Sequence, residues 1–151
     1  MMKEHISRYM DPRLIVILNT ATRDETLHKM VHQIFEAGKL ANEEDFFRAI
    51  IDREKIVSTG IGMGVAIPHA KLPSYDHFFI ALGVLQKPVD WHALDGVPVR
   101  IVFMIGGPDD KQNEYLQILS SLTQAIKKDE TRKKILTIQE PSAMIDLFKA
   151  I

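Results

Sequence analysis

The sequence predicts an α/β fold: a single domain with a mixed β-sheet of about five strands and helices on both faces. Short apolar runs rich in β-branched residues alternate with segments whose apolar residues recur at helical spacing. The expected order is a strand, two helices, several strands and then further helices, which is not the strict alternation of a doubly wound parallel sheet. No repeat, low-complexity segment or Gly/Ser/Pro-rich linker divides the chain, so residues 1–151 are expected to form one domain.

The N-terminal third is expected to contain one strand and two helices. Leu14–Leu18 is a short continuous apolar run, typical of a buried strand. A capping-box pattern at Thr22–Glu25 begins the first helix, and Gly38 suits its C-terminal end. The second helix is expected to begin near Asn42 and to end near Arg53–Glu54.

The middle of the chain combines a glycine-rich loop with strands. Ser58–Gly64 contains three glycines, and the apolar segment Val65–Ile67 that follows is ended by a proline. Phe78–Leu85 and Val97–Ile105 have the composition of strands, and the second is apolar on both faces, as in the interior of a sheet. Gly106–Asp109 is expected to be a turn.

The C-terminal third is expected to be helical. Asn113 is expected to cap a helix whose apolar residues recur at helical spacing, namely Leu116, Leu119, Leu122 and Ile126. Thr131–Leu136 is expected to form a short helix, and Pro141 suits the first position of a last one.

Composition excludes several classes of function. Hydrophobic residues make up 46% and charged residues 26% of the chain, and the net charge of −1 gives no attraction to nucleic acid or anionic lipid. The chain has no cysteine, so disulfides, thiolate metal sites and cysteine nucleophiles are absent. The apolar runs are too short to span a bilayer, and residues 1–10 lack the apolar stretch of a secretory signal. We therefore expect no direct membrane insertion, and a cytoplasmic protein fits these properties.

His69 is the first candidate for chemistry. Pro68 restricts its own φ and holds Ile67 extended, so His69 is expected at the end of a short strand, fixed yet reachable. A neutral imidazole nitrogen can attack an electrophilic phosphorus, while the other nitrogen carries the proton and needs an acceptor. The alternative interpretation is an ordinary surface histidine beside a proline turn.

Two further features could serve a phosphoryl group. Gly60, Gly62 and Gly64 would let backbone amides approach an anion closely, although their spacing is not that of a Walker A motif. Arg53 lies where the second helix should end, and its planar guanidinium suits phosphate oxygens. The alternatives are a flexible connection for the glycines and a salt bridge or a solvated charge for the arginine.

Metal chemistry is a weaker alternative. His28 and His32 have the i, i+4 spacing of zinc ligands on a helix, which would allow a metal hydrolase. However, the sequence has no HExxH signature and no evident third ligand, so a boundary position beside the apolar stripe is the favoured interpretation. We therefore expect neither a metal nor a cofactor.

Taken together, the motifs resemble enzyme IIA of the fructose/mannitol class in the bacterial phosphoenolpyruvate-dependent phosphotransferase system. The likeness covers nearly the whole chain, and its most specific segments are Arg53-Glu54, Ser58–Gly62, Val65–Lys71, Asp95–Val99 and Leu116–Leu122. The resemblance is strongest to the stand-alone nitrogen-regulatory and fructose-type branch, because the chain lacks the cysteine of a fused IIB domain.

The resemblance implies a phosphotransferase component that acts as a phosphocarrier. His69 would accept a phosphoryl group from the histidine-containing phosphocarrier protein and become tele-phosphohistidine, and Arg53 would stabilise the phosphate. Onward transfer would occur in trans to a IIB-type partner, or the phosphorylation state would serve as a signal to regulatory target proteins. An apolar patch around His69 is expected for such transient association.

Two positions depart from the pattern of the family. Tyr115 stands where many members have a second histidine, and a phenol can hydrogen-bond a phosphate oxygen but cannot become a cation. Met63 stands where mannitol-type members carry an acidic residue, which weakens a mannitol assignment. The alternative function is therefore a regulatory protein-binding module with weak or no phosphotransfer.

Overall fold

The computed structural model describes residues 6–150 and confirms the predicted α/β class. The sheet has six strands, one more than the approximate number expected, because the glycine-rich segment contributes a strand of its own. The expectation that no secretory signal begins the chain concerns in part residues 1–5, which lie outside the described residues.

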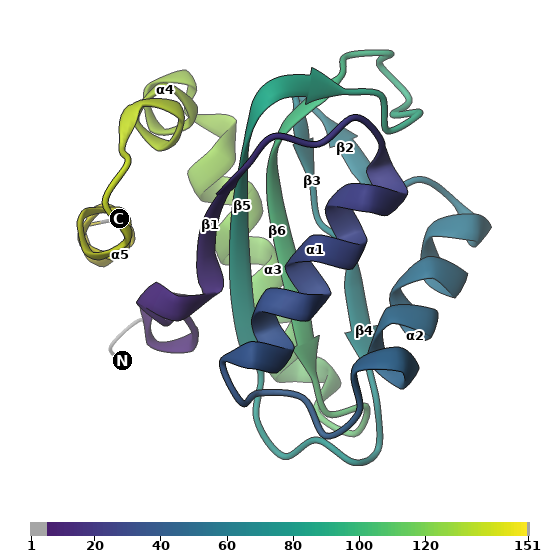
Figure 1. Ribbon diagram of the computed structural model, residues 1–151. Coiled ribbons are helices and arrows are strands. Elements are labelled where there is room, and N and C mark those ends of the chain that lie inside the picture. The colour runs from purple at the N-terminus through teal and green to yellow at the C-terminus, as the bar shows by residue number, and fades with distance from the viewer. Residues whose placement is uncertain (1–5, 151) are drawn as a thin grey trace.

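The mixed sheet is built around the long central strand β6 (Val99–Gly107). Its path is β1-β5-β6-β3-β2, and β4 also pairs with β6 (Figure 1). β5 and β6 are antiparallel, whereas β3 and β4 run parallel to β6, one after the other along its length. The strands are β1 (Ile15–Leu18), β2 (Gly60–Gly62), β3 (Val65–Ala66), β4 (His69–Lys71), β5 (Phe79–Val89) and β6 (Val99–Gly107).

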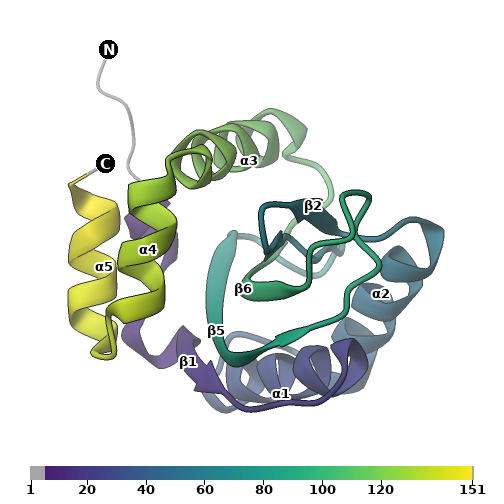
Figure 2. The same cartoon turned by 90° about the horizontal axis from the view of Figure 1, so that it is seen from above.

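Helices cover both faces of the sheet. The helices α1 (Arg23–Glu36) and α2 (Glu43–Ile56) lie on one face, and α3 (Gln112–Lys127), α4 (Asp129–Thr137) and α5 (Pro141–Lys149) lie on the other (Figure 2). Each face buries its own cluster of apolar side chains, so the sheet separates two core layers. Within residues 6–150, no helix combines the length and the apolar character needed to cross a membrane.

The predicted N-terminal cap of the first helix and the predicted start of the second are confirmed. Thr22 Oγ1 accepts a hydrogen bond from the Glu25 amide at 3.1 Å, and Asn42 Oδ1 accepts one from the Asp45 amide at 3.0 Å. α2 continues to Ile56, two residues beyond its expected end. The prediction that Asn113 caps the next helix is wrong, because α3 already begins at Gln112 without a side-chain cap. The segment before β1 forms two short 3-10 helices, η1 (Ile6–Tyr9) and η2 (Pro12–Leu14).

The prediction that Gly106–Asp109 forms a turn is wrong for its first two residues. Gly106 and Gly107 belong to β6, where they pair with β5 and β4. A Cβ atom at Gly106 would lie 2.3 Å from Phe79 Cζ, and one at Gly107 would lie 2.3 Å from Phe78 Cδ1. These glycines therefore allow two aromatic rings to lie directly on the strand, which is a known use of glycine inside a sheet.

Candidate active site

His69 begins β4, in register with Ile105 of β6. The carbonyl of Pro68, just before it, accepts a hydrogen bond from the Ile105 amide at 3.0 Å, so the histidine backbone is fixed to the central strand. The half-buried ring places Nδ1 3.2 Å from the carbonyl oxygen of Ile67. A carbonyl oxygen only accepts hydrogen bonds, so this contact favours the tautomer with the proton on Nδ1. The lone pair is then on Nε2.

Burial keeps the His69 ring neutral. Its pKa lies below the ordinary value of 6.5, first because the ring is removed from water. The nearby positive charges of Arg53 and Lys71 lower the pKa further, while the hydrogen bond to Ile67 opposes the shift. At neutral pH the ring therefore has a nitrogen lone pair available for attack.

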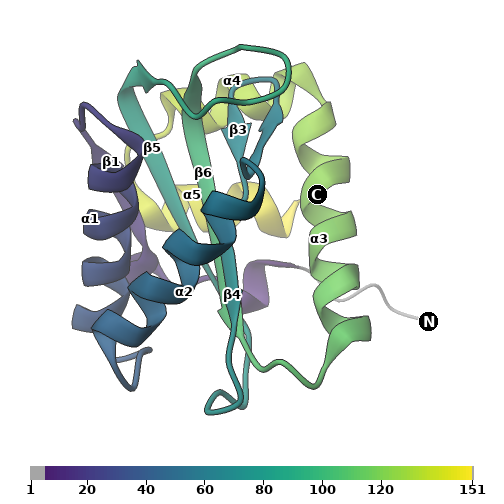
Figure 3. The same ribbon diagram turned by 90° about the vertical axis from the view of Figure 1, so that its right-hand side faces the viewer.

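Arg53 and Tyr115 lie close to this ring. The ring of Tyr115, contributed by α3, has its centroid 5.4 Å from that of His69. Arg53 lies in the last turn of α2, which crosses over β4 in Figure 3, and its Nη1 donates to the carbonyl of Val57 at 3.2 Å. Its charge acts on both His69 and Tyr115. The structure thus brings together the three side chains that the sequence singled out.

A second cation, Lys71, also contacts Tyr115. Lys71 Nζ lies 4.2 Å from the centre of the Tyr115 ring, in a cation–π contact, and donates to Gln112 Oε1 at 2.8 Å. Phe78 also packs on this ring, with centroids 6.3 Å apart. Burial raises the pKa of Tyr115, so its hydroxyl keeps its proton and can donate a hydrogen bond. The sequence analysis did not identify Gln112, because no local pattern marks this residue.

The glycine segment does not meet His69. It folds as a hairpin of β2 and β3, and its register lies opposite Ile101 and Val102 of β6. His69 lies opposite Ile105, three to four residues further along β6, or about 10–13 Å at the usual rise per residue. The segment predicted to bind phosphate is therefore at a different level of the sheet, because β3 and β4 pair with successive parts of one strand.

The hairpin turn already holds an anion of the protein itself. Gly62, Met63 and Gly64 have positive φ angles, and Asp95 Oδ2 accepts a hydrogen bond from the Met63 amide at 3.0 Å. The amide of Val97 donates to Oδ1 of the same carboxylate at 3.0 Å, and these backbone bonds lower the Asp95 pKa. The glycines thus serve the turn and its contact with Asp95.

His28 and His32 are both exposed on α1, and they have different partners. The ring of His28 packs edge-on against Phe47, with centroids 5.3 Å apart. His32 Nδ1 lies 2.7 Å from Glu43, and its Nε2 lies 3.3 Å from Glu36. Among residues 6–150, no three His, Asp or Glu side chains are arranged to hold a metal ion. These contacts give the metal-hydrolase alternative no support.

The sequence analysis does not predict a buried carboxylate beside the site. Glu54 is only 3% exposed and accepts two hydrogen bonds from Thr59, one from the amide at 2.9 Å and one from the hydroxyl at 2.6 Å. Thr59 Oγ1 in turn accepts from Nε1 of the buried Trp91 at 3.1 Å. The available signal was the position of Glu54, which lies four residues after the buried Ile50 and therefore on the apolar face of α2.

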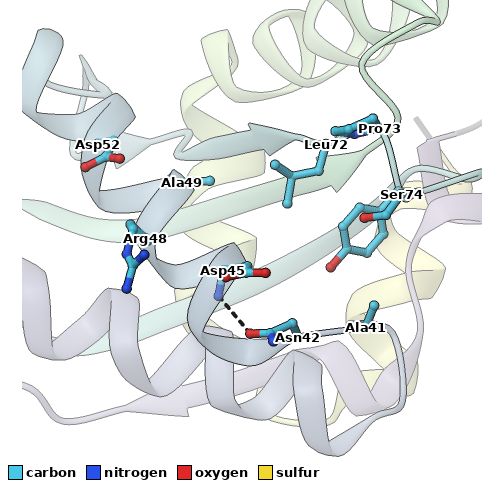
Figure 4. A pocket seen from close by; sticks show the side chains of 10 residues that line it. Ala41, Asn42, Asp45, Arg48, Ala49, Asp52, Leu72, Pro73 and Ser74 are labelled. Atoms are coloured by element: carbon cyan, nitrogen blue, oxygen red, sulfur yellow. Dashed lines mark hydrogen bonds between the residues drawn. The ribbon is translucent and has the colours of Figure 1, made fainter.

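An open hollow with a volume of about 540 Å³ lies beside this site. It separates α2 from the turn after β4, where Leu72 and Pro73 face Ala49 (Figure 4). Asp45, Arg48 and Asp52 give its wall charges of both signs. None of the predicted site residues lines this hollow, so it is not part of the candidate site.

Comparison with known proteins identifies the family of the chain. Residues 8–151 match the model of the family "Phosphoenolpyruvate-dependent sugar phosphotransferase system, EIIA 2". The fructose-specific EIIABC component of Bacillus subtilis is 37% identical over 131 residues, which is 87% of this chain but 21% of that protein. The chain therefore spans about a fifth of the length of that relative.

Two solved structures have the same fold. The nitrogen regulatory protein IIA-Ntr from Neisseria meningitidis superposes with a TM-score of 0.89 at 25% identity, covering 95% of this chain and 98% of that one. Enzyme IIAMTL from Escherichia coli, solved in complex with phosphorylated enzyme IIBMTL, gives 0.77 at 17% identity, covering 92% and 96%. Because the family model matches almost the whole length of this chain, the chain belongs to the EIIA 2 family of the phosphoenolpyruvate-dependent sugar phosphotransferase system.

Proposed function

We propose that the protein is a phosphocarrier that accepts a phosphoryl group on Nε2 of His69 from the histidine-containing phosphocarrier protein. The observation that carries the proposal is the 3.2 Å contact between His69 Nδ1 and the Ile67 carbonyl oxygen, which leaves the lone pair on Nε2. The lowered pKa of His69 and the nearby charge of Arg53 support it. Membership of a phosphotransferase family supports the reaction class. Such exchange would take place in the cytoplasm.

The proposed step follows from the tautomer. The Nε2 lone pair forms a bond to phosphorus while the phosphorus–nitrogen bond of the donor breaks, and the donor ring leaves with that electron pair. The Nδ1 proton stays in place, so the phosphorylated ring gains positive charge next to the Ile67 carbonyl, which is suited to stabilise it. Arg53 would stabilise the phosphoryl oxygens, and the Tyr115 hydroxyl would donate a hydrogen bond to one of them.

Onward transfer would be the reverse of this step: the bond between phosphorus and Nε2 of His69 breaks, the His69 ring keeps that electron pair, and a nucleophile of the acceptor forms the new bond to phosphorus. We propose that the acceptor is a IIB-type protein bound in trans, as the complex of the Escherichia coli relative with phosphorylated enzyme IIBMTL illustrates. Exposed apolar side chains follow two of the site residues in the chain, namely Ile56 and Val57 after Arg53 and Leu116 after Tyr115. They could supply the apolar contact that transient partners need.

A labelling experiment tests the phosphocarrier function. Enzyme I, the histidine-containing phosphocarrier protein and phosphoenolpyruvate should give an acid-labile, base-stable phosphoprotein. His69→Gln should abolish the label, whereas His77→Gln should keep it, because His77 is an exposed histidine outside the site. An unlabelled wild-type protein in the presence of active donors would refute the proposal.

The second candidate is a regulatory module in which the phosphoryl group acts only as a signal. Tyr115 in place of the family's second histidine and the likeness to a nitrogen regulatory protein favour it. In this case phosphorylated wild type should bind a target protein with an affinity different from that of the unmodified protein, without losing its label to a IIB domain. Equal affinities would argue against a switch controlled by charge.

A further inference from the structure

The burial of the Glu54 side chain, which is only 3% exposed, needs a physical explanation. Removing a charged group from water is costly unless hydrogen bonds compensate for it. Both carboxylate oxygens are used by one residue, because Oε1 accepts from the Thr59 amide and Oε2 from the Thr59 hydroxyl. The carboxylate thus fixes the position of Thr59, five residues further along the chain.

The direction of these hydrogen bonds follows from the groups on either side of Thr59. An indole N–H only donates, so Thr59 Oγ1 accepts from Trp91, and a carboxylate only accepts, so the Thr59 hydroxyl donates its own proton to Glu54. Ser58 adds a further bond, from its hydroxyl to the Trp91 carbonyl at 2.6 Å. All of these groups are buried or partly buried, so rearranging one bond would leave another polar atom without a partner.

The same threonine is connected to the reactive histidine. Its carbonyl accepts a hydrogen bond from the Ile67 amide at 3.0 Å, and the Ile67 carbonyl lies 3.2 Å from His69 Nδ1. Arg53, which precedes Glu54, donates to the Val57 carbonyl within the same segment. The ring of His69 and the guanidinium of Arg53 are therefore both anchored to the short stretch of chain that Glu54 and Thr59 hold in place.

We propose that Glu54 and Thr59 are positioning residues that set the tautomer of His69 through Ile67. This inference rests on the proposed function only insofar as the tautomer matters for phosphoryl transfer. When the Glu54–Thr59 bonds are broken, the Ile67 carbonyl moves away from Nδ1, and the proton becomes distributed between the two ring nitrogens. Less of the protein then has a free Nε2, and transfer slows.

The test measures the tautomer directly, without a phosphoryl donor. Nitrogen-15 NMR of the His69 ring should show a predominant Nδ1–H form in wild type and a mixture in Thr59→Val and in Glu54→Gln. Thr59→Ser should restore the wild-type ratio, because serine keeps both the hydroxyl and the amide. The rate of phosphorylation in the first two variants should fall in proportion to the fraction of Nδ1–H tautomer that is lost, so that a 1:1 mixture of tautomers gives a rate about 2-fold lower than that of wild type.

Thr26→Val is the matched control. Thr26 is fully buried on α1, and its hydroxyl bonds to the Thr22 carbonyl and to Thr20, on a different element from the site. This variant should lose stability as Thr59→Val does, yet keep the wild-type tautomer. If Thr59→Val fails to fold, the isosteric Glu54→Gln decides, since it keeps the volume and the bond from the Thr59 amide.

The outcomes separate this inference from the proposed function. A wild-type tautomer ratio in folded Thr59→Val or Glu54→Gln would overturn the positioning role, whatever happens to the rate. An equal change of the ratio in Thr26→Val would overturn it as well, because the effect would then be general destabilisation. A failure of wild type to accept phosphoryl would refute the proposed function, and the NMR spectra would still decide the positioning role.

Discussion

The protonation state of His69 controls whether this residue can act as a nucleophile. Because burial and two cations lower its pKa, the ring stays neutral at pH values where an exposed histidine is already charged. Protonation removes the lone pair, so the rate of phosphorylation should fall only as the pH drops through a value below 6.5. Single-turnover labelling across pH, with NMR titration of the same ring, measures this. An acid limb centred at or above 6.5 would contradict the inferred environment.

Tyr115 offers a second prediction for a single side chain. Tyr115→Phe keeps the contacts with Lys71, Phe78 and His69 but removes the hydroxyl. Losing one hydrogen bond to the phosphoryl group should cost about 1 kcal/mol, or about a 5-fold lower transfer rate. Rapid-quench measurement of transfer from the phosphorylated donor tests this, and thermal unfolding of both proteins serves as the control. A rate equal to that of wild type would show that the hydroxyl does not touch the phosphoryl group.

The sequence predicts some residues of the site better than others for a physical reason. His69 could be identified because Pro68 determines the local backbone, and both residues belong to one short segment. The partner of the hairpin amide, Asp95, lies 32 residues from Met63 in the chain, and no local pattern connects them. The glycine segment was predicted to bind an external phosphate because the carboxylate that its turn contacts, that of Asp95, comes from this distant part of the chain.

At the level of elements, the end of β6 depends on the absence of side chains. Gly106→Ala would place a Cβ atom 2.3 Å from Phe79 Cζ and 2.8 Å from Phe46 Cε1, in a packed layer. Overpacking of this kind should lower the free energy of unfolding by about 1–3 kcal/mol. Urea denaturation measures the change. Gly96→Ala is the comparison, because nothing lies within 4 Å of that Cβ and only its φ of +72° opposes the change. A smaller loss in Gly106→Ala than in Gly96→Ala would contradict the packing described here.

The same strand shows where prediction of elements fails. The order of strands and helices follows from local apolar patterns, and the caps at Thr22 and Asn42 follow from local hydrogen bonding. A pair of glycines, however, is typical of both a turn and a strand that approaches another group closely. Phe78 and Phe79, which are distant from Gly106 and Gly107 in the sequence and pack on them in the folded sheet, explain why these glycines belong to a strand.

At the level of the whole molecule, two core layers share one sheet. Phe148 of α5 is buried against Phe103 of β6, with ring centroids 5.8 Å apart, while Trp91 belongs to the layer on the other face. Phe148→Ala should lower the free energy of unfolding by about 3–5 kcal/mol.

Both layers should nevertheless unfold together, because each is packed on the same central strands. Trp91 fluorescence and far-UV circular dichroism of the Phe148→Ala variant should therefore report one common midpoint in urea. A separate, earlier transition in the circular dichroism signal would show that α3, α4 and α5 unfold on their own.

The pairing of β4 with the central strand limits how His69 could exchange a phosphoryl group with two partner proteins. His69 lies in a ladder of hydrogen bonds to β6, so it has no swinging arm with which to visit two proteins in turn. Under the proposed function, the protein that delivers the phosphoryl group and the protein that removes it would have to bind the same small surface, one after the other. An excess of the unphosphorylated donor should then slow onward transfer, because it would occupy the surface that the acceptor needs.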